Sequence, residues 1–258
     1  MAGDAVWEFV SSSESSLLPE LALMHDCSSW YHSHYSLQAW DGVFGGIVIN
    51  GPAAGNYDID KGVLFLNDWD SQTASAKYTY AQTQGPPTLD TGLINGTNTN
   101  GSLGSRWETS VESGKSYLFR VVNGAVDTHF DFMVDNHTLT VVGMDFVRTE
   151  PLTPTIPLKF QANVYISQVP IEPYTAETIS IGMGQRYDVI LTADQASVAT
   201  DFWLRAIPDS FCSENYNGDD IKGIIRYGDS TGTLSPFPFL LLATLTDALR
   251  SNTYYDWV

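Results

Sequence analysis

The sequence is poor in basic residues and in cysteine, and both shortages limit what the chain can be. Lys and Arg number 12 against 30 Asp and Glu, which gives a formal net charge of −18. Such a chain repels phosphate backbones and anionic lipid, so we expect no nucleic acid and no membrane among its partners. The two cysteines, Cys27 and Cys212, could form a disulfide or remain buried thiols, and two alone do not define a redox compartment.

Long hydrophobic runs are also absent. The apolar run Phe237–Leu245 has about half the length that a bilayer requires, so we predict no transmembrane helix. Residues 1–24 are acidic and rich in serine, and they lack the basic start and apolar centre of a signal peptide. We therefore expect no signal peptide in this chain. Three glycosylation sequons, at Asn95, Asn100 and Asn136, are nevertheless typical of a secreted glycoprotein.

The pattern that is present between about Ala53 and Tyr227 is that of an all-β protein. Short β-branched or aromatic runs alternate with Gly, Pro, Asn and Asp turns, as in an antiparallel sandwich or barrel. No segment shows the 3.6-residue periodicity of a long helix. Turns at 112–114 and 135–137 resemble hairpins. We predict about nine strands: Gly62–Trp69, Ser105–Ser110, Lys115–Asn123, Phe130–Val134, Thr138–Phe146, Thr178–Ile181, Arg186–Ala193, Phe202–Ile207 and Gly223–Tyr227.

Two histidines separated by one serine are the clearest chemical signal. In a β-strand alternate side chains share a face, so His32 and His34 project together with their Cα atoms roughly 6.6 Å apart. Two imidazoles on one side form half of a metal site, although such a pair can also be a coincidence on a surface strand. The following segment, DGVFGGIVINGP, predicts a glycine turn and an apolar strand that ends at Pro52.

The string WYHSH followed by DGVFGGIVINGP resembles the second copper-ligand segment of laccases, most closely those of filamentous ascomycete fungi. Further motifs occur in the same order as in the second domain of these multicopper oxidases. The resemblance implies a cupredoxin-like Greek-key sandwich, copper as cofactor, phenolic small molecules and O2 as substrates, and an extracellular location. The motifs are GPPTLDTGLINGTNT, RWETSVESGK, RVVNGAVDTHFDF, VDNHTLTV, ISIGMGQRYDVI and IKGIIRY.

The resemblance also divides the chain into regions. Residues 25–53 correspond to a remnant of a first cupredoxin domain, because a complete sandwich of this kind needs roughly 100 residues. Residues 54–229 correspond to a near-complete second domain. Residues 148–169 interrupt the resemblance within it, and they are either a surface insertion or the product of a retained intron. We leave 1–24 unassigned and expect a divergent tail at 230–258.

The matching positions imply site roles. His32 and His34 correspond to type 3 copper ligands of a trinuclear cluster that reduces dioxygen to water. That cluster takes eight histidines in the family, and this chain has five in total, so we expect no complete laccase. His25, His129 and His137 match no copper ligand of the family, and we interpret them as surface or structural residues.

Asp145 corresponds to a carboxylate that laccases place beside the phenol, where it can accept the hydroxyl proton as the electron leaves. An ordinary carboxylate at the end of a strand is the alternative. We further expect Arg186 and Asp188 to pair across strands and to stabilise the fold. Four aromatic residues are expected in the core rather than in a pocket: Trp30, Tyr31, Trp40 and Trp69.

These observations predict a fragment of a laccase-like multicopper oxidase that is inactive alone. An isolated pair of imidazoles would hold Cu(II) or Zn(II) only weakly, because the other ligands are missing. One alternative is a non-catalytic cupredoxin-like binding or interaction module. Another is a fragment of an ascorbate oxidase or a ferroxidase.

Overall fold

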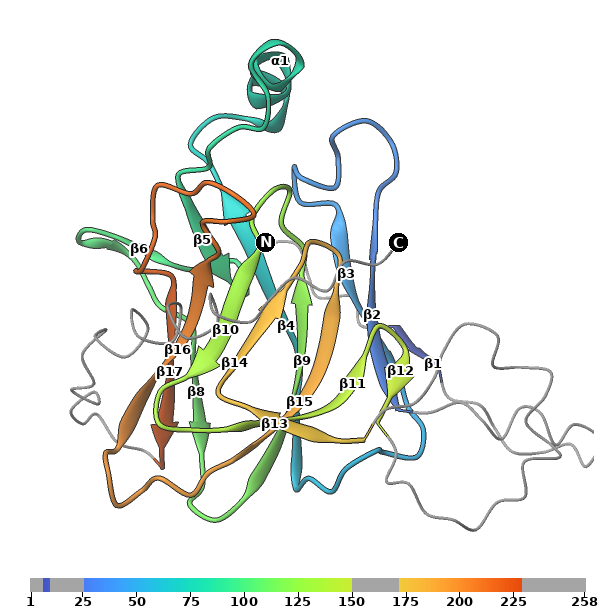
Figure 1. The fold of residues 1–258 in the computed structure, drawn as a ribbon, viewed down its shortest axis with the longest axis vertical. Helices are drawn as coiled ribbons and strands as arrows, with labels where there is room; N and C mark the ends of the chain where they lie inside the picture. The colour runs from blue at the N-terminus through green and yellow to red at the C-terminus, as the bar shows by residue number, and fades with distance from the viewer. Residues whose placement is uncertain (1–6, 10–25, 150–171, 229–258) are drawn as a thin grey trace, which may run out of the picture.

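Two mixed β-sheets lie face to face in the computed structural model, which describes residues 7–9, 26–149 and 172–228 (Figure 1). The pattern of short runs and turns predicted such a sandwich, and the all-β class is confirmed. The five-stranded sheet has the order β14 (Thr178–Ile181), β10 (Phe130–Val134), β16 (Asp201–Pro208), β17 (Lys222–Tyr227), β8 (Glu108–Val111).

The seven-stranded sheet forms the second layer. In this sheet β4 pairs in parallel with β9, and in the first sheet β17 pairs in parallel with β8. The sequence predicted an antiparallel sandwich, and these two pairings depart from that prediction. Parallel neighbours need long crossover connections, which local turn residues do not reveal. The order is β12 (Val147–Arg148), β11 (Leu139–Met144), β15 (Arg186–Thr192), β9 (Ser116–Asn123), β4 (Ile59–Trp69), β5 (Thr91–Ile94), with β13 (Tyr174–Ala176) paired to β11.

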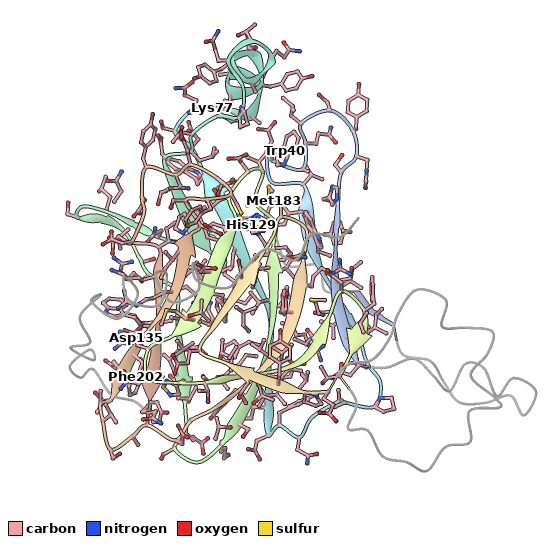
Figure 2. All side chains as sticks on the ribbon, viewed as in Figure 1. Trp40, Lys77, His129, Asp135, Met183 and Phe202 are labelled. Atoms are coloured by element: carbon pink, nitrogen blue, oxygen red, sulfur yellow. The ribbon has the colours of Figure 1, made fainter. Side chains whose placement is uncertain are left out.

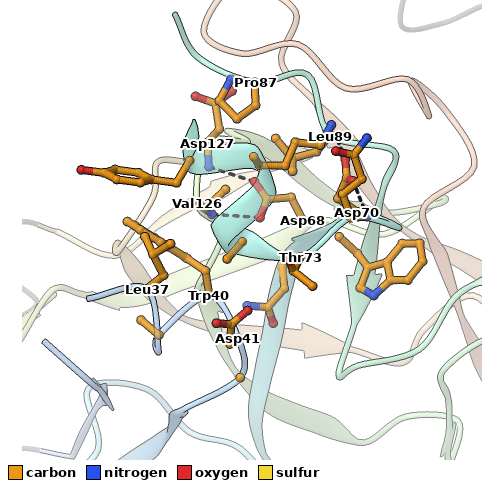
Figure 3. A pocket seen from close by; sticks show the side chains of 18 of the residues that line it. Leu37, Trp40, Asp41, Asp68, Asp70, Thr73, Pro87, Leu89, Val126 and Asp127 are labelled. Atoms are coloured by element: carbon orange, nitrogen blue, oxygen red, sulfur yellow. Dashed lines mark hydrogen bonds and ion pairs between the residues drawn. The ribbon is translucent and has the colours of Figure 1, made fainter. Parts of the chain in front are cut away.

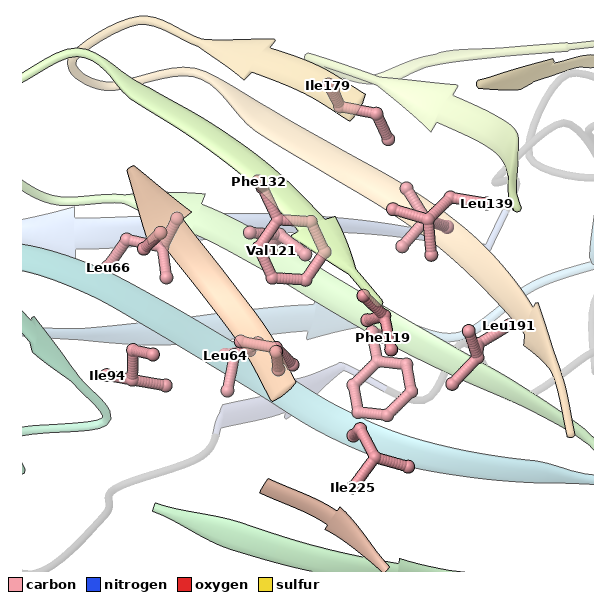
Figure 4. Packing of buried hydrophobic residues seen from close by; sticks show 14 of the residues in the cluster. Leu64, Leu66, Ile94, Phe119, Val121, Phe132, Leu139, Ile179, Leu191 and Ile225 are labelled. Carbon is pink, nitrogen blue, oxygen red and sulfur yellow. The ribbon is translucent and has the colours of Figure 1, made fainter. Parts of the chain in front are cut away.

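The core lies between these sheets (Figure 4). The strand β9, in the middle of the seven-stranded sheet, lines one side of it. Tyr117, Phe119 and Val121 alternate along β9 and are buried on the side that faces the five-stranded sheet. The predicted alternation in β10 is confirmed as well, because its apolar residues pack against the same cluster. These residues are Phe130, Phe132 and Val134.

The opposite face of β9 is also buried, which a two-layer sandwich alone would not require. Leu118 packs there with Val142 and Ile190, and residues 54–57 lie over them. A three-stranded sheet adjoins this face, with the order β1 (Trp7–Phe9), β3 (Phe44–Ile49), β2 (Cys27–His32). The two strands predicted between Trp30 and Pro52 are therefore confirmed, and β2 lies against the seven-stranded sheet.

Both turns that resemble hairpins form, but neither joins paired strands. Gly114 and Asn136 adopt the left-handed conformation, with φ of 85° and 63°, as tight reversals require. The strands on either side of each turn belong to different sheets. The turn residues predicted the reversal of the chain, whereas the choice of a pairing partner depends on the whole topology.

One helix, α1 (Ala74–Gln84), was not predicted. Thr73 caps its first turn by accepting a hydrogen bond from the Ala76 amide, and Gly85 follows its end. No residue of α1 is buried, and the helix stands away from the sandwich in Figure 1. Because it lacks an apolar stripe, the helical period is invisible in its sequence. Among the described residues no helix has the length and apolar character needed to cross a membrane.

Several predictions concern residues outside the described ranges. These are the role of His25, most of the unassigned segment 1–24, nearly all of the insertion at 148–169 and the tail at 230–258. Within residues 1–24 the structure describes only β1, which pairs in parallel with β3.

Candidate functional site

The two histidine rings lie side by side, as predicted. His32 is the last residue of β2, and His34 follows in the loop, yet their ring centroids are 4.4 Å apart and nearly parallel. The Ser33 amide donates to the Val43 carbonyl at 2.9 Å, which continues the pairing of β2 with β3 by one hydrogen bond. The extended geometry therefore reaches His34 although the strand ends before it.

Trp30 holds the His32 ring from the other side. The two ring centroids are 4.5 Å apart, and the Trp30 indole Nε1 donates to the Gly184 carbonyl at 3.4 Å. Met183, the residue before Gly184, is labelled in Figure 2. His32 Nδ1 lies 3.2 Å from the Ser33 carbonyl oxygen. When Nδ1 donates to that carbonyl, Nε2 keeps its lone pair and is the atom that can bind a metal.

The remaining described histidines do not join this pair. His137 is buried, and its two nitrogens contact the Asp135 carbonyl at 2.8 Å and the Tyr227 hydroxyl at 2.7 Å. Burial lowers the pKa of His137, which favours the neutral ring. The Nδ1 atom of His129 is buried without a hydrogen-bond partner among the described residues. Across those residues no group of three or more His, Cys, Asp or Glu side chains could hold a metal ion.

Asp145 occupies the tip of the turn between β11 and β12. It adopts a left-handed conformation with φ of 47°, and its Oδ1 accepts a hydrogen bond from the Arg186 amide at 2.9 Å. The same Oδ1 atom forms an ion pair with the Arg186 guanidinium, also at 2.9 Å. That guanidinium lies over the Phe146 ring as well. These contacts explain Asp145 as a turn residue, and its proposed role beside a phenol remains a prediction.

The predicted pairing of Arg186 with Asp188 is wrong. Both residues lie on β15, and each contacts a partner from another strand or turn. Arg186 pairs with Asp145, whereas Asp188 stands opposite Arg120 of β9 and accepts a hydrogen bond from Ser28. Because Arg186 and Asp188 are two residues apart on one strand, their side chains share a face and cannot pair across strands with each other. Each side chain finds its partner on a neighbouring strand or turn instead.

A cavity of about 630 Å³ opens close to the loop that follows the histidines (Figure 3). Trp40 and Trp69 were predicted in the core, but they are 50% and 45% exposed and line this cavity. Asp68 also lines the cavity, and its carboxylate accepts hydrogen bonds from the amides of 126–128. Lys77 of α1 reaches across to Asp70 at 2.7 Å. Tyr31 is also partly exposed, at 38%.

The two cysteines are free, so the disulfide left open by the sequence does not form. Cys27 is half-buried at the start of β2, and burial beside Asp188 and Asp26 raises the pKa of its thiol to about 11. Cys212 is exposed on a loop. Both thiols are consequently protonated near neutral pH.

The contact of Trp30 with His32 was missed in the sequence, although a signal for it existed. Residues two apart on a strand share a face, so Trp30, His32 and His34 form one row. The partners of the buried Arg120 had no such local signal, because Asp26 lies 94 positions away in the chain. Only the packing of β2 on the seven-stranded sheet brings these two residues together.

A mixed β-sandwich with a histidine pair at the end of an adjoining strand has the architecture of a copper oxidase domain. The chain belongs to the multicopper oxidase family: one family profile, described as multicopper oxidase, matches residues 60–156 and 164–230, and a second with the same description matches 9–54. Residues 157–163, within the predicted insertion, are unmatched. The second profile includes both histidines of the pair.

Fungal laccases are among the similar proteins. Laccase-1 of Botryotinia fuckeliana is 45% identical over 209 residues, which cover 81% of this chain and 33% of that protein. Oxidoreductase OpS5 of Beauveria bassiana is 39% identical over 218 residues, which cover 80% of this chain and 33% of that protein. The chain thus spans about a third of the length of these relatives.

Solved structures agree with this assignment. The laccase from Botrytis aclada matches with a TM-score of 0.67 and 37% identity, over 83% of this chain and 38% of that chain. Fet3p, described as a multicopper oxidase that functions in iron import, matches with a TM-score of 0.62 at 19% identity, and that likeness concerns the fold alone. The predicted resemblance to laccase-like multicopper oxidases is confirmed.

Proposed function

We propose that this chain supplies one wall of the copper centre of a laccase-type oxidase, with His32 and His34 as type 3 copper ligands. The observation that carries the proposal is the stacking of the two imidazoles within a segment that the multicopper oxidase family matches. Imidazole is a suitable ligand for copper, but two rings are fewer than a closed site needs. The other ligands would come from polypeptide outside these residues.

The proposed substrates are phenolic molecules and O2. Copper, when bound, would carry electrons from the phenol to oxygen. Asp145 would take up the phenolic proton, because its Oδ2 atom takes no part in the two Oδ1 contacts with Arg186. In an active assembly Asp145→Asn should slow phenol oxidation and leave oxidation of hexacyanoferrate(II), which releases no proton, unchanged. Equal slowing of both donors would contradict this role.

A ferroxidase or ascorbate oxidase parent is an alternative within the same family. The laccases named above are 37–45% identical to the chain, whereas Fet3p is 19% identical, and this difference favours the laccase. Substrate choice in a parent enzyme can be tested by comparing a phenol, ferrous iron and ascorbate as electron donors.

A non-catalytic binding module is the second candidate. The observation in its favour is that the described residues contain no group of three metal-ligating side chains. Copper titration of the purified chain, followed by electron paramagnetic resonance, separates the two candidates. The oxidase proposal predicts weak Cu(II) binding that His32→Ala and His34→Ala abolish and His129→Ala preserves. Binding that is absent, or indifferent to His32 and His34, would favour the binding module.

An extracellular, glycosylated parent is proposed as well. Among the sequons, Asn95 and Asn100 are exposed, and Asn100 belongs to the hairpin of β6 (Thr99–Asn100) and β7 (Leu103–Gly104). Asn136 is only half exposed in its tight turn. Mass spectrometry of protein secreted from a fungal host should find glycan at Asn100. Unmodified Asn100 in such material would contradict the proposal.

A further inference from the structure

A buried cluster of charges lies where β2 meets the seven-stranded sheet. Arg120 of β9 is 1% exposed, and its Nη2 atom lies 2.7 Å from Asp26 Oδ1 and 2.8 Å from Asp60 Oδ2. Its Nε atom donates to Asp60 at 2.9 Å. Asp188 stands opposite Arg120 in the register of β15, but its Oδ2 atom is 4.0 Å from Arg120 Nη1. Arg120 is thus satisfied mainly by two of the three carboxylates.

The cluster holds more negative than positive charge. Three carboxylates face one guanidinium, and Asp188 is both deeply buried and the most distant from Arg120. A buried carboxylate without a close cation is costly, so it takes up a proton more readily than one in water. Burial, reinforced by the charge of Asp26, raises the pKa of Asp188 to about 6 against the opposing effects of Ser28 and Arg120.

Two other ionisable groups near Asp188 stay uncharged near that pH. The Cys27 thiol stays neutral, since burial raises its pKa to about 11. The Tyr57 hydroxyl donates to Asp26 at 3.2 Å, and burial raises its pKa as well. The Arg186 guanidinium is paired with Asp145. Burial thus moves the charge change of Asp188 into mildly acidic solution.

Asp188 also attaches β2 to the sheet. The Ser28 hydroxyl donates to Asp188 Oδ1, and Ser28 is buried. Together with the contact between Asp26 and Arg120, this hydrogen bond joins the start of β2 to β9 and β15. The same strand carries Trp30 and ends at His32. Any loosening of its start will therefore reach the histidine pair.

We propose that Asp188 is a positioning residue that holds β2, and with it the histidine pair, more firmly to the seven-stranded sheet in acid than in neutral solution. A protonated Asp188 removes one unit of excess negative charge and can both accept from and donate to Ser28. An ionised Asp188 leaves two unbalanced negative charges in a buried place. The attachment acts through Ser28 and β2, whether or not a metal is bound.

The direction of the pH dependence follows from linkage. The pKa of Asp188 in the folded chain, about 6, lies above its ordinary value of 3.8, so the attached state binds a proton more tightly than the detached state. The stabilisation is fully present below the ordinary value and is lost as the pH rises through about 6. Between pH 4.5 and 7.5 the attachment equilibrium should weaken by about tenfold or more.

Hydrogen exchange on the full chain without metal tests the proposal. Amide protection in β2, corrected for intrinsic exchange and divided by that in β16, should fall about tenfold between pH 4.5 and 7.5, with a midpoint near pH 6. Asp188→Asn mimics the protonated acid, and its ratio should stay constant. Asp219→Asn makes the same change at an exposed carboxylate and should keep the wild-type curve. A step that survives Asp188→Asn would overturn the proposal.

Carboxyl-carbon NMR of the unaltered chain provides a second measurement, should Asp188→Asn fail to fold. The Asp188 signal should titrate near pH 6, well above the ordinary pKa value of 3.8 for an aspartate. Titration of Asp188 at its ordinary value of 3.8 would overturn the proposal. Since neither measurement uses copper, failure here is distinct from failure of the proposed oxidase function.

Discussion

At the scale of single residues, the orientation of His32 depends on neighbours from separate parts of the chain. His34 stacks on one side of its ring, and Trp30 on the other. The Ser33 carbonyl faces Nδ1, and the Trp30 indole is itself fixed by the Gly184 carbonyl in the loop between β14 and β15. A ligand that is held in this way loses little conformational freedom when a metal binds.

Replacement of Arg120 should be among the most damaging single changes. Arg120→Met removes the guanidinium that faces the carboxylates of Asp26, Asp60 and Asp188 and leaves them facing one another. Breaking a buried ion pair in this way costs about 3–5 kcal/mol of the free energy of unfolding. Urea unfolding measures the loss. The matched change Lys115→Met breaks an exposed pair with Glu112 and should change the free energy of unfolding little. Similar losses in both variants would contradict the importance of the buried cluster.

The sequence predicted the histidine pair because its geometry depends only on the period of a strand. It did not predict the partners of Arg186 and Asp188, because a strand sequence shows which residues share a face but not which strand lies alongside. Trp40 was misplaced for a similar reason. Its size favours burial, yet the loop that carries it lies over a cavity rather than over the core.

At the scale of elements, β9 determines how the layers stack, because both of its faces are buried. One face builds the sandwich core, and the other contacts the segment 54–57 and β2. The sequence predicted a strand here but not the burial of both its faces, although a near-continuous apolar run is typical of such a strand. Arg120, in the middle of that run, lies at the second interface. Helix α1 was missed because its polar sequence has no stripe to detect, and Thr73 and Gly85 alone define its ends.

The packing of β3 on β4 depends on the absence of a side chain at Gly46. A Cβ atom there would lie 2.8 Å from Val63 Cγ2, closer than such atoms approach. Gly46→Ala should therefore displace β3 and destabilise the chain by about 1–3 kcal/mol, the usual cost of overpacking. Thermal unfolding measures the change. Gly218→Ala adds the same methyl group in open space and should change stability little. Equal stability of the two variants would contradict this packing.

At the scale of the whole molecule, the chain combines a closed core with an incomplete site. The sandwich core is continuous through both large sheets, while the histidine pair has no further metal-ligating group beside it among the described residues. The chain also spans about a third of its laccase relatives. A net charge of −18 favours solubility and opposes association with other acidic molecules. Fold and family are therefore properties of the chain, and oxidase activity is proposed for a larger assembly.

Oxygen uptake by a chimera shows whether this chain can supply copper ligands to an oxidase. The matching third of Laccase-1 from Botryotinia fuckeliana would be replaced by this chain, and the copper-loaded protein supplied with a phenol. We expect copper-dependent oxygen uptake by the chimera, none by the chain alone, and loss of uptake in the chimera with His32→Ala or His34→Ala. The control His137→Asn should retain uptake if the chimera folds. A folded chimera whose uptake survives the loss of both His32 and His34 would contradict the account.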